Sequence, residues 1–176
     1  MSDYLAVKVT TDSITTALAG LAAAYDDLMP LFHDIGEEMV NSSLENFREG
    51  SGPDGTVWAP RSQTTLDAYA RRKPPFVPSG GPLIGESKSL STTISYEATG
   101  DGVLWGSNMI YAAVMQLGAK QGEFGARIGK NTKGRDFFMT IPWGDIPPRP
   151  FLGIGPDDET AILEIVEDFL ADAAGV

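Results

Sequence analysis

The chain has 176 residues, 42% of them hydrophobic, with one histidine and no cysteine. This composition excludes disulfide bonds and thiolate metal sites, and it leaves almost no material for a histidine metal cage or a Ser-His triad. No apolar run approaches the roughly 18 residues of a membrane-spanning helix, and the first residues do not resemble a secretory leader. We therefore expect a single domain over residues 1–176, made in a reducing compartment.

The net charge of −11 is distributed unevenly along the chain. Residues 1–60 carry 2 basic and 10 acidic side chains, residues 61–140 carry 10 and 6, and residues 141–176 carry 1 and 8. Two acidic ends therefore bracket a mildly basic middle. An acidic protein is poorly suited to gripping a DNA backbone, whereas a surface divided by charge sign suits docking to other proteins, including copies of itself.

The first 50 residues predict a short strand followed by two helices. Residues 4–10 are apolar and β-branched, as in an edge strand. Asp12 or Ser13 can cap a helix that runs to about residue 28. Pro30 suits the first turn of a second helix, whose apolar residues recur at helical spacing as far as Glu49.

The centre of the chain alternates turns, a long connection and strands. "GPDG" (52–55) is a strong turn signal, and residues 59–82 hold five prolines and the basic trio 71–73, which predicts a surface connection with one helical turn near residues 65–69. Residues 89–107 predict a hairpin, and residues 111–119 a short apolar element that ends at Gly118.

Residues 119–135 contain four glycines and five basic residues, which predicts a mobile loop or an extended hairpin tip before a strand at 136–143. The predicted helices and strands together indicate an α+β fold. In it, a small antiparallel sheet packs with the long N-terminal amphipathic helix and a C-terminal helix.

The segment "IPPRPFLG" (146–153) predicts a stiff extended strut, because each proline lacks an N–H and has a fixed φ. After it, Pro156 and the acidic residues 157–159 form a favourable helix start, since carboxylates meet the positive end of the helix dipole. An apolar face continues this helix to about residue 173.

No group of residues predicts an active site. Glu37, Glu38 and Glu45 could supply paired carboxylates for acid–base catalysis, but the polar face of an amphipathic helix explains them more simply. His33 has no second histidine to pair with. We expect no catalytic residue, no cofactor and no metal.

Two sets of residues are candidates for contacts with a subunit or partner. Trp58 is expected either to cover the edge of the core or to anchor a subunit contact, and the same alternatives apply to Arg149, Phe151 and Leu152. Arg149, stiffened by its flanking prolines, is expected to pair with a carboxylate. The second set consists of the loop cations Lys120, Arg127, Lys130, Lys133 and Arg135. For these, a solvated loop, docking onto an acidic protein surface and contact with DNA stay open.

Three segments follow one another along the chain: "NFREGSGPDGTVWAPRS" (46–62), "YAAVMQLGA" (111–119) and "IPPRPFLGIGPDDETAILEIVEDFL" (146–170). Their order resembles that of the phage virion morphogenesis proteins, which are S-type tail completion proteins of long-tailed phages, including Mu-like ones. The chain resembles this family over nearly its whole length. Met115 departs from the family pattern, in which a histidine is common before the glutamine.

The resemblance implies a structural protein without enzymatic activity, which is assembled in the host cytoplasm into the head–tail junction of the virion. It implies a ring of copies of the chain that contacts neighbouring tail and head-connector proteins, and no contact with membrane. Tail completion, tail termination and a head-side connector stay open as roles, as does non-specific contact with genome DNA in the channel.

Overall fold

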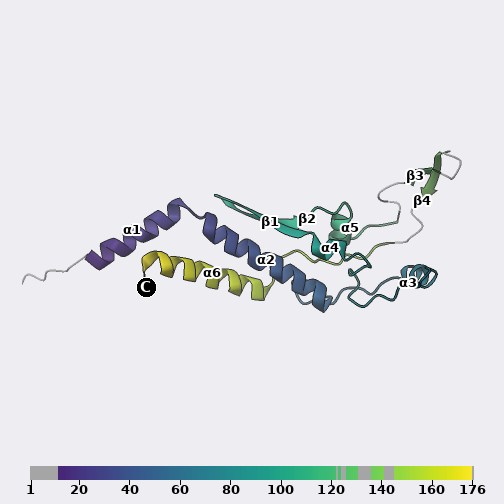
Figure 1. Cartoon of the computed structure of the whole chain (residues 1–176), viewed down its shortest axis with the longest axis horizontal. Coiled ribbons are helices and arrows are strands. Elements are labelled where there is room, and N and C mark those ends of the chain that lie inside the picture. Colours follow the sequence, from purple (N-terminus) through teal and green to yellow (C-terminus); the bar gives the residue numbers. More distant parts are fainter. Residues whose placement is uncertain (1–11, 122, 124–125, 131–135, 141–144, 176) are drawn as a thin grey trace, which may run out of the picture.

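Figure 1 shows the computed structural model of the chain, which describes residues 12–121, 123, 126–130, 136–140 and 145–175. The strand predicted at residues 4–10 lies outside these ranges. The helices in the described part are α1 (Asp12–Asp26), α2 (Met29–Glu49), α3 (Gln63–Ala70), α4 (Ser89–Thr92), α5 (Ala112–Leu117) and α6 (Pro156–Ala174). The strands are β1 (Ile94–Thr99), β2 (Gly102–Ser107), β3 (Ala126–Lys130) and β4 (Asp136–Thr140), so the predicted α+β class is confirmed.

Helix α2 has the ends that its sequence predicts. Pro30 lies in the first turn, where a missing N–H costs no helical hydrogen bond, and the Asp27 carboxylate accepts a hydrogen bond from the N–H of Met29 at 3.1 Å. The helix ends at Gly50, whose φ of 74° is the left-handed conformation that favours glycine. Gly50 then leads into the predicted turn.

Helix α2 lies between the β1–β2 sheet and α6, and these three elements form one core (Figure 1). Leu31, Ile35 and Met39 are buried on α2. The half-buried apolar side chains that pack on them come from the sheet and from α6, and include Val103, Trp105, Ile162, Ile165, Val166 and Phe169. Gly36 allows the sheet to approach, because a Cβ there would lie 2.3 Å from the ring of Tyr96.

Helix α1 packs against the C-terminal end of α6. A Cβ at Gly20 would lie 2.0 Å from the carbonyl oxygen of Ala173, so this crossing requires a residue without a side chain. The rest of α1 is largely exposed, including Ile14, Leu18 and Tyr25.

The predicted hairpin begins later than expected. Strands β1 and β2 pair antiparallel from Ile94↔Ser107 to Thr99↔Gly102, whereas residues 89–92 form the short helix α4. The hydroxyl groups of Thr92 and Thr93 donate to the carbonyls of Lys88 and Ser89 at 3.2 and 2.8 Å. Such local bonds favour a helical turn even where β-branched residues suggest a strand.

Residues 59–82, predicted as a surface connection, and residues 119–135, predicted as a loop or hairpin tip, both contain regular secondary structure. Within residues 59–82, α3 spans eight residues, and the Ser62 hydroxyl caps it by accepting from the N–H of Thr65 at 3.3 Å. Within residues 119–135, β3 pairs antiparallel with β4, from Ala126↔Thr140 to Lys130↔Asp136. The extended-hairpin alternative therefore describes residues 126–130.

A second core joins the C-terminal end of α2 to the segments that follow it. Its buried members are Phe47, Trp58, Leu90, Ile94, Ala112 and Phe151. None of the helices in the described ranges combines the length and the apolar character that crossing a membrane would require.

Candidate functional site

The strut (residues 146–153) is held along its length by residues far away in the sequence. Ile146 and Ala119 exchange two backbone hydrogen bonds, with N···O distances of 2.7 and 2.9 Å. The N–H of Arg149 donates to the carbonyl of Met115 at 2.8 Å. The prolines remove the other ladder donors, so side chains must satisfy the remaining backbone groups.

Gln116 supplies several of the missing partners. Its Oε1 accepts from the N–H groups of Phe151 and Leu152 at 2.9 and 3.0 Å, and its Nε2 donates to the carbonyl of Leu152 at 2.7 Å. A side-chain amide carries one acceptor and one donor group, as a peptide unit does. Gln116 therefore binds the strut as a neighbouring strand would.

Arg149 does not pair with a carboxylate among the described residues, contrary to the sequence-based expectation. Its Nε and Nη2 donate to the carbonyls of Ala59 and Pro60 at 2.8 and 2.9 Å. The side chain is buried, and this burial, with a smaller effect from the charge of Arg61, lowers the pKa of the guanidinium. A proline lacks an N–H but keeps its carbonyl as an acceptor, and the planar fork of Arg149 donates to two such neighbouring carbonyls at once.

Arg61 extends the same arrangement into the long connection. Its guanidinium donates to the carbonyls of Gly80 at 3.1 Å, of Ile84 at 2.6 Å and of Gly81. Arg149 thus fixes residues 59–60, and the arginine that follows them fixes residues 80–84. Two buried or partly buried arginines replace a sheet in holding these segments.

The aromatic candidates Trp58 and Phe151 lie inside the chain's own core. Phe151 is 0% exposed and Trp58 is 4% exposed. The ring of Phe47 lies 5.2 Å from that of Phe151 and 5.6 Å from that of Trp58, and the Trp58 Nε1 donates to the carbonyl of Pro150 at 2.8 Å. Leu152 packs against the same cluster. A role for these residues at a subunit contact stays a prediction, since their side chains are covered here by the chain itself.

The turn after α2 and the start of α6 touch closely. A Cβ on Gly155 would lie 2.0 Å from the carbonyl oxygen of Pro53, and a Cβ on Gly153 would lie 2.9 Å from the Pro53 ring. The N–H of Gly155 donates to the buried Asp158 carboxylate at 2.6 Å. The terminal helix is therefore placed by a backbone contact with the turn that ends α2.

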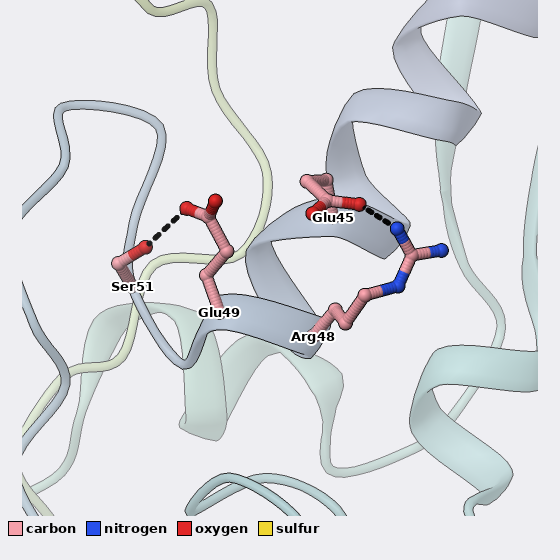
Figure 2. Close-up of polar contacts among 4 residues, drawn as sticks. All are labelled: Glu45, Arg48, Glu49 and Ser51. Atoms are coloured by element: carbon pink, nitrogen blue, oxygen red, sulfur yellow. Dashed lines mark hydrogen bonds and ion pairs between the residues drawn. The ribbon is translucent and has the colours of Figure 1, made fainter.

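The three glutamates that could have formed an active site lie in two places on α2. Glu37 accepts from the Tyr96 hydroxyl at 3.4 Å on the sheet side of α2. Glu38 and Glu45 line a cleft of about 420 Å³ that Glu49 and Asp157 also border. Figure 2 shows that Glu45 pairs with Arg48, while the hydroxyl of Ser51 donates to Glu49 at 3.3 Å. In the described part of the chain, no three acidic or histidine side chains are arranged to hold a metal ion.

His33 is exposed and lies beside the sheet. Its Nδ1 lies 3.3 Å from the Tyr96 hydroxyl, and the two rings meet edge to face at 5.8 Å. Burial raises the pKa of Tyr96, and the neighbouring charges of Glu37 and Asp34 raise it further. His33, Glu37 and Tyr96 therefore form a polar cluster beside the sheet.

The candidate cations are placed only in part. Lys120 is exposed, and its backbone N–H donates to the Glu123 carboxylate at 2.7 Å. Arg127 and Lys130 lie on β3. Lys133 and Arg135 lie outside the described residues. Contacts of this loop with a partner stay a prediction.

The structural roles of Gln116 and Arg61 were not predicted from the sequence. Each is a polar side chain next to a segment rich in proline or glycine, where backbone groups lack ladder partners. Such a pattern indicates that side chains must form hydrogen bonds with the unpaired backbone groups. It does not indicate which side chains do so, because the partners are far apart in the sequence.

The whole chain can be compared with known proteins. Residues 9–171 match the model of the phage virion morphogenesis family. The chain is 30% identical over 156 residues to a protein of Haemophilus influenzae (strain ATCC 51907 / DSM 11121 / KW20 / Rd) named Mu-like prophage FluMu G protein 2, covering 89% of this chain and 88% of that protein. No solved structure matches it. The chain belongs to the phage virion morphogenesis family, and its role is in the assembly of the phage particle.

Proposed function

We propose that the chain is a non-enzymatic structural protein of the phage neck, which forms a ring with copies of itself at the head–tail junction. It completes the tail or joins it to the head connector. The proposal builds on the family membership and on the relationship to a Mu-like prophage protein.

The observation that carries the proposal is the balance of buried and exposed apolar side chains. Among the described residues, nine hydrophobic side chains are buried, whereas thirteen large ones are exposed. Exposed apolar residues are normal when they are scattered singly, but on an elongated chain with a small core they indicate surfaces that partners cover.

The test is electron microscopy of particles made without this protein. Full heads beside finished tails support a joining or completing role, while overlong tails point to a tail terminator. Normal, infectious particles contradict the proposal. The copy number of the ring, a hexamer or dodecamer by analogy with phage necks, is read from averaged images of the neck.

A second candidate function is contact with DNA through residues 120–135, favoured by the five cations of the 119–135 loop. Binding through phosphate contacts is strongly weakened by salt. Retention of the protein on duplex DNA at low salt, lost as salt is raised, supports this function. A lack of retention at low salt contradicts it.

A further inference from the structure

An apolar groove of about 520 Å³ lies where the end of α1 meets the last turns of α6. Leu21, Tyr25 and Leu28 line one side of it, and Phe169 and Leu170 line the other. Tyr25 is 77% exposed and Leu170 is 46% exposed. Apolar surface of this kind is favourably removed from water when a partner side chain fills the groove.

Helix α1 itself indicates that something covers this end of the molecule. Residues 13–25 include no charged residue, although Ile14 is 53% exposed and Leu18 is 60% exposed. A helix without a charged face is ordinarily buried, and here α6 covers only the side that carries Gly20.

The charges around the groove are all of one sign. Asp26 and Asp27 follow Tyr25 directly, and Asp168 and Asp172 flank the residues that α6 contributes. All four are exposed, and neither residues 12–47 nor residues 156–174 contain a lysine or an arginine. A matching partner should therefore present apolar side chains surrounded by basic ones.

The chain has such a surface, which we call the α3 knob (residues 63–78). Val77 is 80% exposed and Leu66 is 38% exposed. The rings of Tyr69 and Phe76 meet edge to face at 4.9 Å and tie the helix to the segment that carries Val77.

The cations of the α3 knob lie beside these apolar residues. The basic trio Arg71, Arg72 and Lys73 is exposed. Arg72 lies over the ring of Tyr69 at 5.2 Å and pairs with Glu86. Arg71 and Lys73 form no ion pair with any described residue, so both are able to bind carboxylates of a partner.

The groove and the knob cannot meet within one molecule. Figure 1 shows α1 and the C-terminal end of α6 at one end of the long axis and α3 at the other. We infer that the α3 knob of one copy docks into the α1–α6 groove of the next copy, with Arg71 and Lys73 facing the aspartates of the groove. Two different surfaces on each copy make a head-to-tail contact, which closes into a ring if the rotation per copy allows it.

This inference rests on the proposed ring, and cysteine cross-linking in assembled particles tests it. The natural chain has no cysteine, so a double variant, Tyr25→Cys with Val77→Cys, reports only on the engineered pair. With a short bis-maleimide, we expect a ladder of dimers, trimers and larger species from the double variant. Each single variant should give none.

The matched control combines Tyr25→Cys with Val57→Cys. Val57 and Val77 are both 80% exposed, but Val57 lies in the turn after α2 and outside the knob. An equal or stronger ladder from this control overturns the inference. So does the absence of a ladder from Tyr25→Cys with Val77→Cys in particles that contain the protein. If purified particles lack the protein altogether, the proposed function fails instead.

A second measurement introduces a negative charge at Val77 or at the control position Val57. Val77→Asp should lower incorporation into particles at least tenfold, because it places a carboxylate against the acidic groove, whereas Val57→Asp should be incorporated as the natural chain is. Circular dichroism checks that both variants keep their helices. Equal incorporation of the two folded variants overturns the inference.

Discussion

The side chain of Gln116 binds the backbone of Leu152 as a neighbouring strand would, with its Nε2 donating to the carbonyl at 2.7 Å and its Oε1 accepting from the N–H at 3.0 Å. The residues lie 36 positions apart, and the prolines before Leu152 prevent an ordinary strand from forming there. One amide therefore positions the segment that leads into the terminal helix.

Replacement of Gln116 by methionine should destabilise the protein. Methionine keeps the length of the side chain but leaves the N–H groups of Phe151 and Leu152 without their acceptor. We expect the free energy of unfolding to fall by about 1–3 kcal/mol, measured by urea denaturation. Gln121→Met is the control, because Gln121 is exposed, and it should change stability little. Equal stability of the two variants would show that Gln116 does not hold the strut.

Replacement of Arg149 by lysine should also destabilise the protein. A lysine ammonium lacks the planar fork with which Arg149 reaches the carbonyls of Ala59 and Pro60. We expect a loss of about 1–3 kcal/mol in the free energy of unfolding. Arg48→Lys is the control, since the Arg48 side chain is 75% exposed. A loss of phage yield without any loss of stability would instead indicate a direct role of Arg149 in a subunit contact.

Alanine at Gly155 should disturb the junction between α2 and α6. The added Cβ would lie 2.0 Å from the carbonyl oxygen of Pro53, and backbone cannot move aside as a flexible side chain can. We expect a loss of about 1–3 kcal/mol, read from the urea midpoint. Gly85→Ala is the control, because nothing lies within 4 Å of a Cβ at that position. If both alanine variants unfold at the natural midpoint, the close approach of the two segments is wrong.

The pKa of Asp54 should reveal whether the hydrogen bonds of the turn after α2 form in solution. The pKa of the Asp54 carboxyl lies below its usual value, first because the N–H of Thr56 donates to it at 3.0 Å and then because the Thr56 hydroxyl donates at 2.8 Å. A folded pKa below the unfolded one means that the stabilisation is present above the unfolded pKa and is lost as the pH falls through the folded pKa. Thr56→Val should raise the pKa of Asp54 part of the way, as followed by carboxyl NMR. Thr64→Val, at an exposed position of α3, should leave it unchanged. Equal titration curves for all three proteins would contradict the contact.

Much of the secondary structure could be predicted from the sequence, because the signals are local. Pro30 and Gly50 mark the ends of α2, and Pro156 with the acidic first turn marks the start of α6. The hairpin at β1 and β2 was visible in its β-branched residues and its turn. Residues 89–92 were assigned wrongly, since hydroxyl-to-backbone bonds outweighed the strand propensity there.

What only the tertiary structure decided is which distant groups meet. Arg149 was expected to pair with a carboxylate, yet it donates to carbonyls some 90 positions away, because the folded chain brings residues 59 and 60 beside its guanidinium. The α1–α6 groove could not be predicted from the sequence, because it forms only where two helices far apart in the chain meet. The fold also places this groove and the α3 knob at opposite ends of the molecule. Composition and periodicity determine which elements form, since these depend on neighbours a few residues apart. The partners of buried polar groups and the surfaces left open depend on the path of the whole chain.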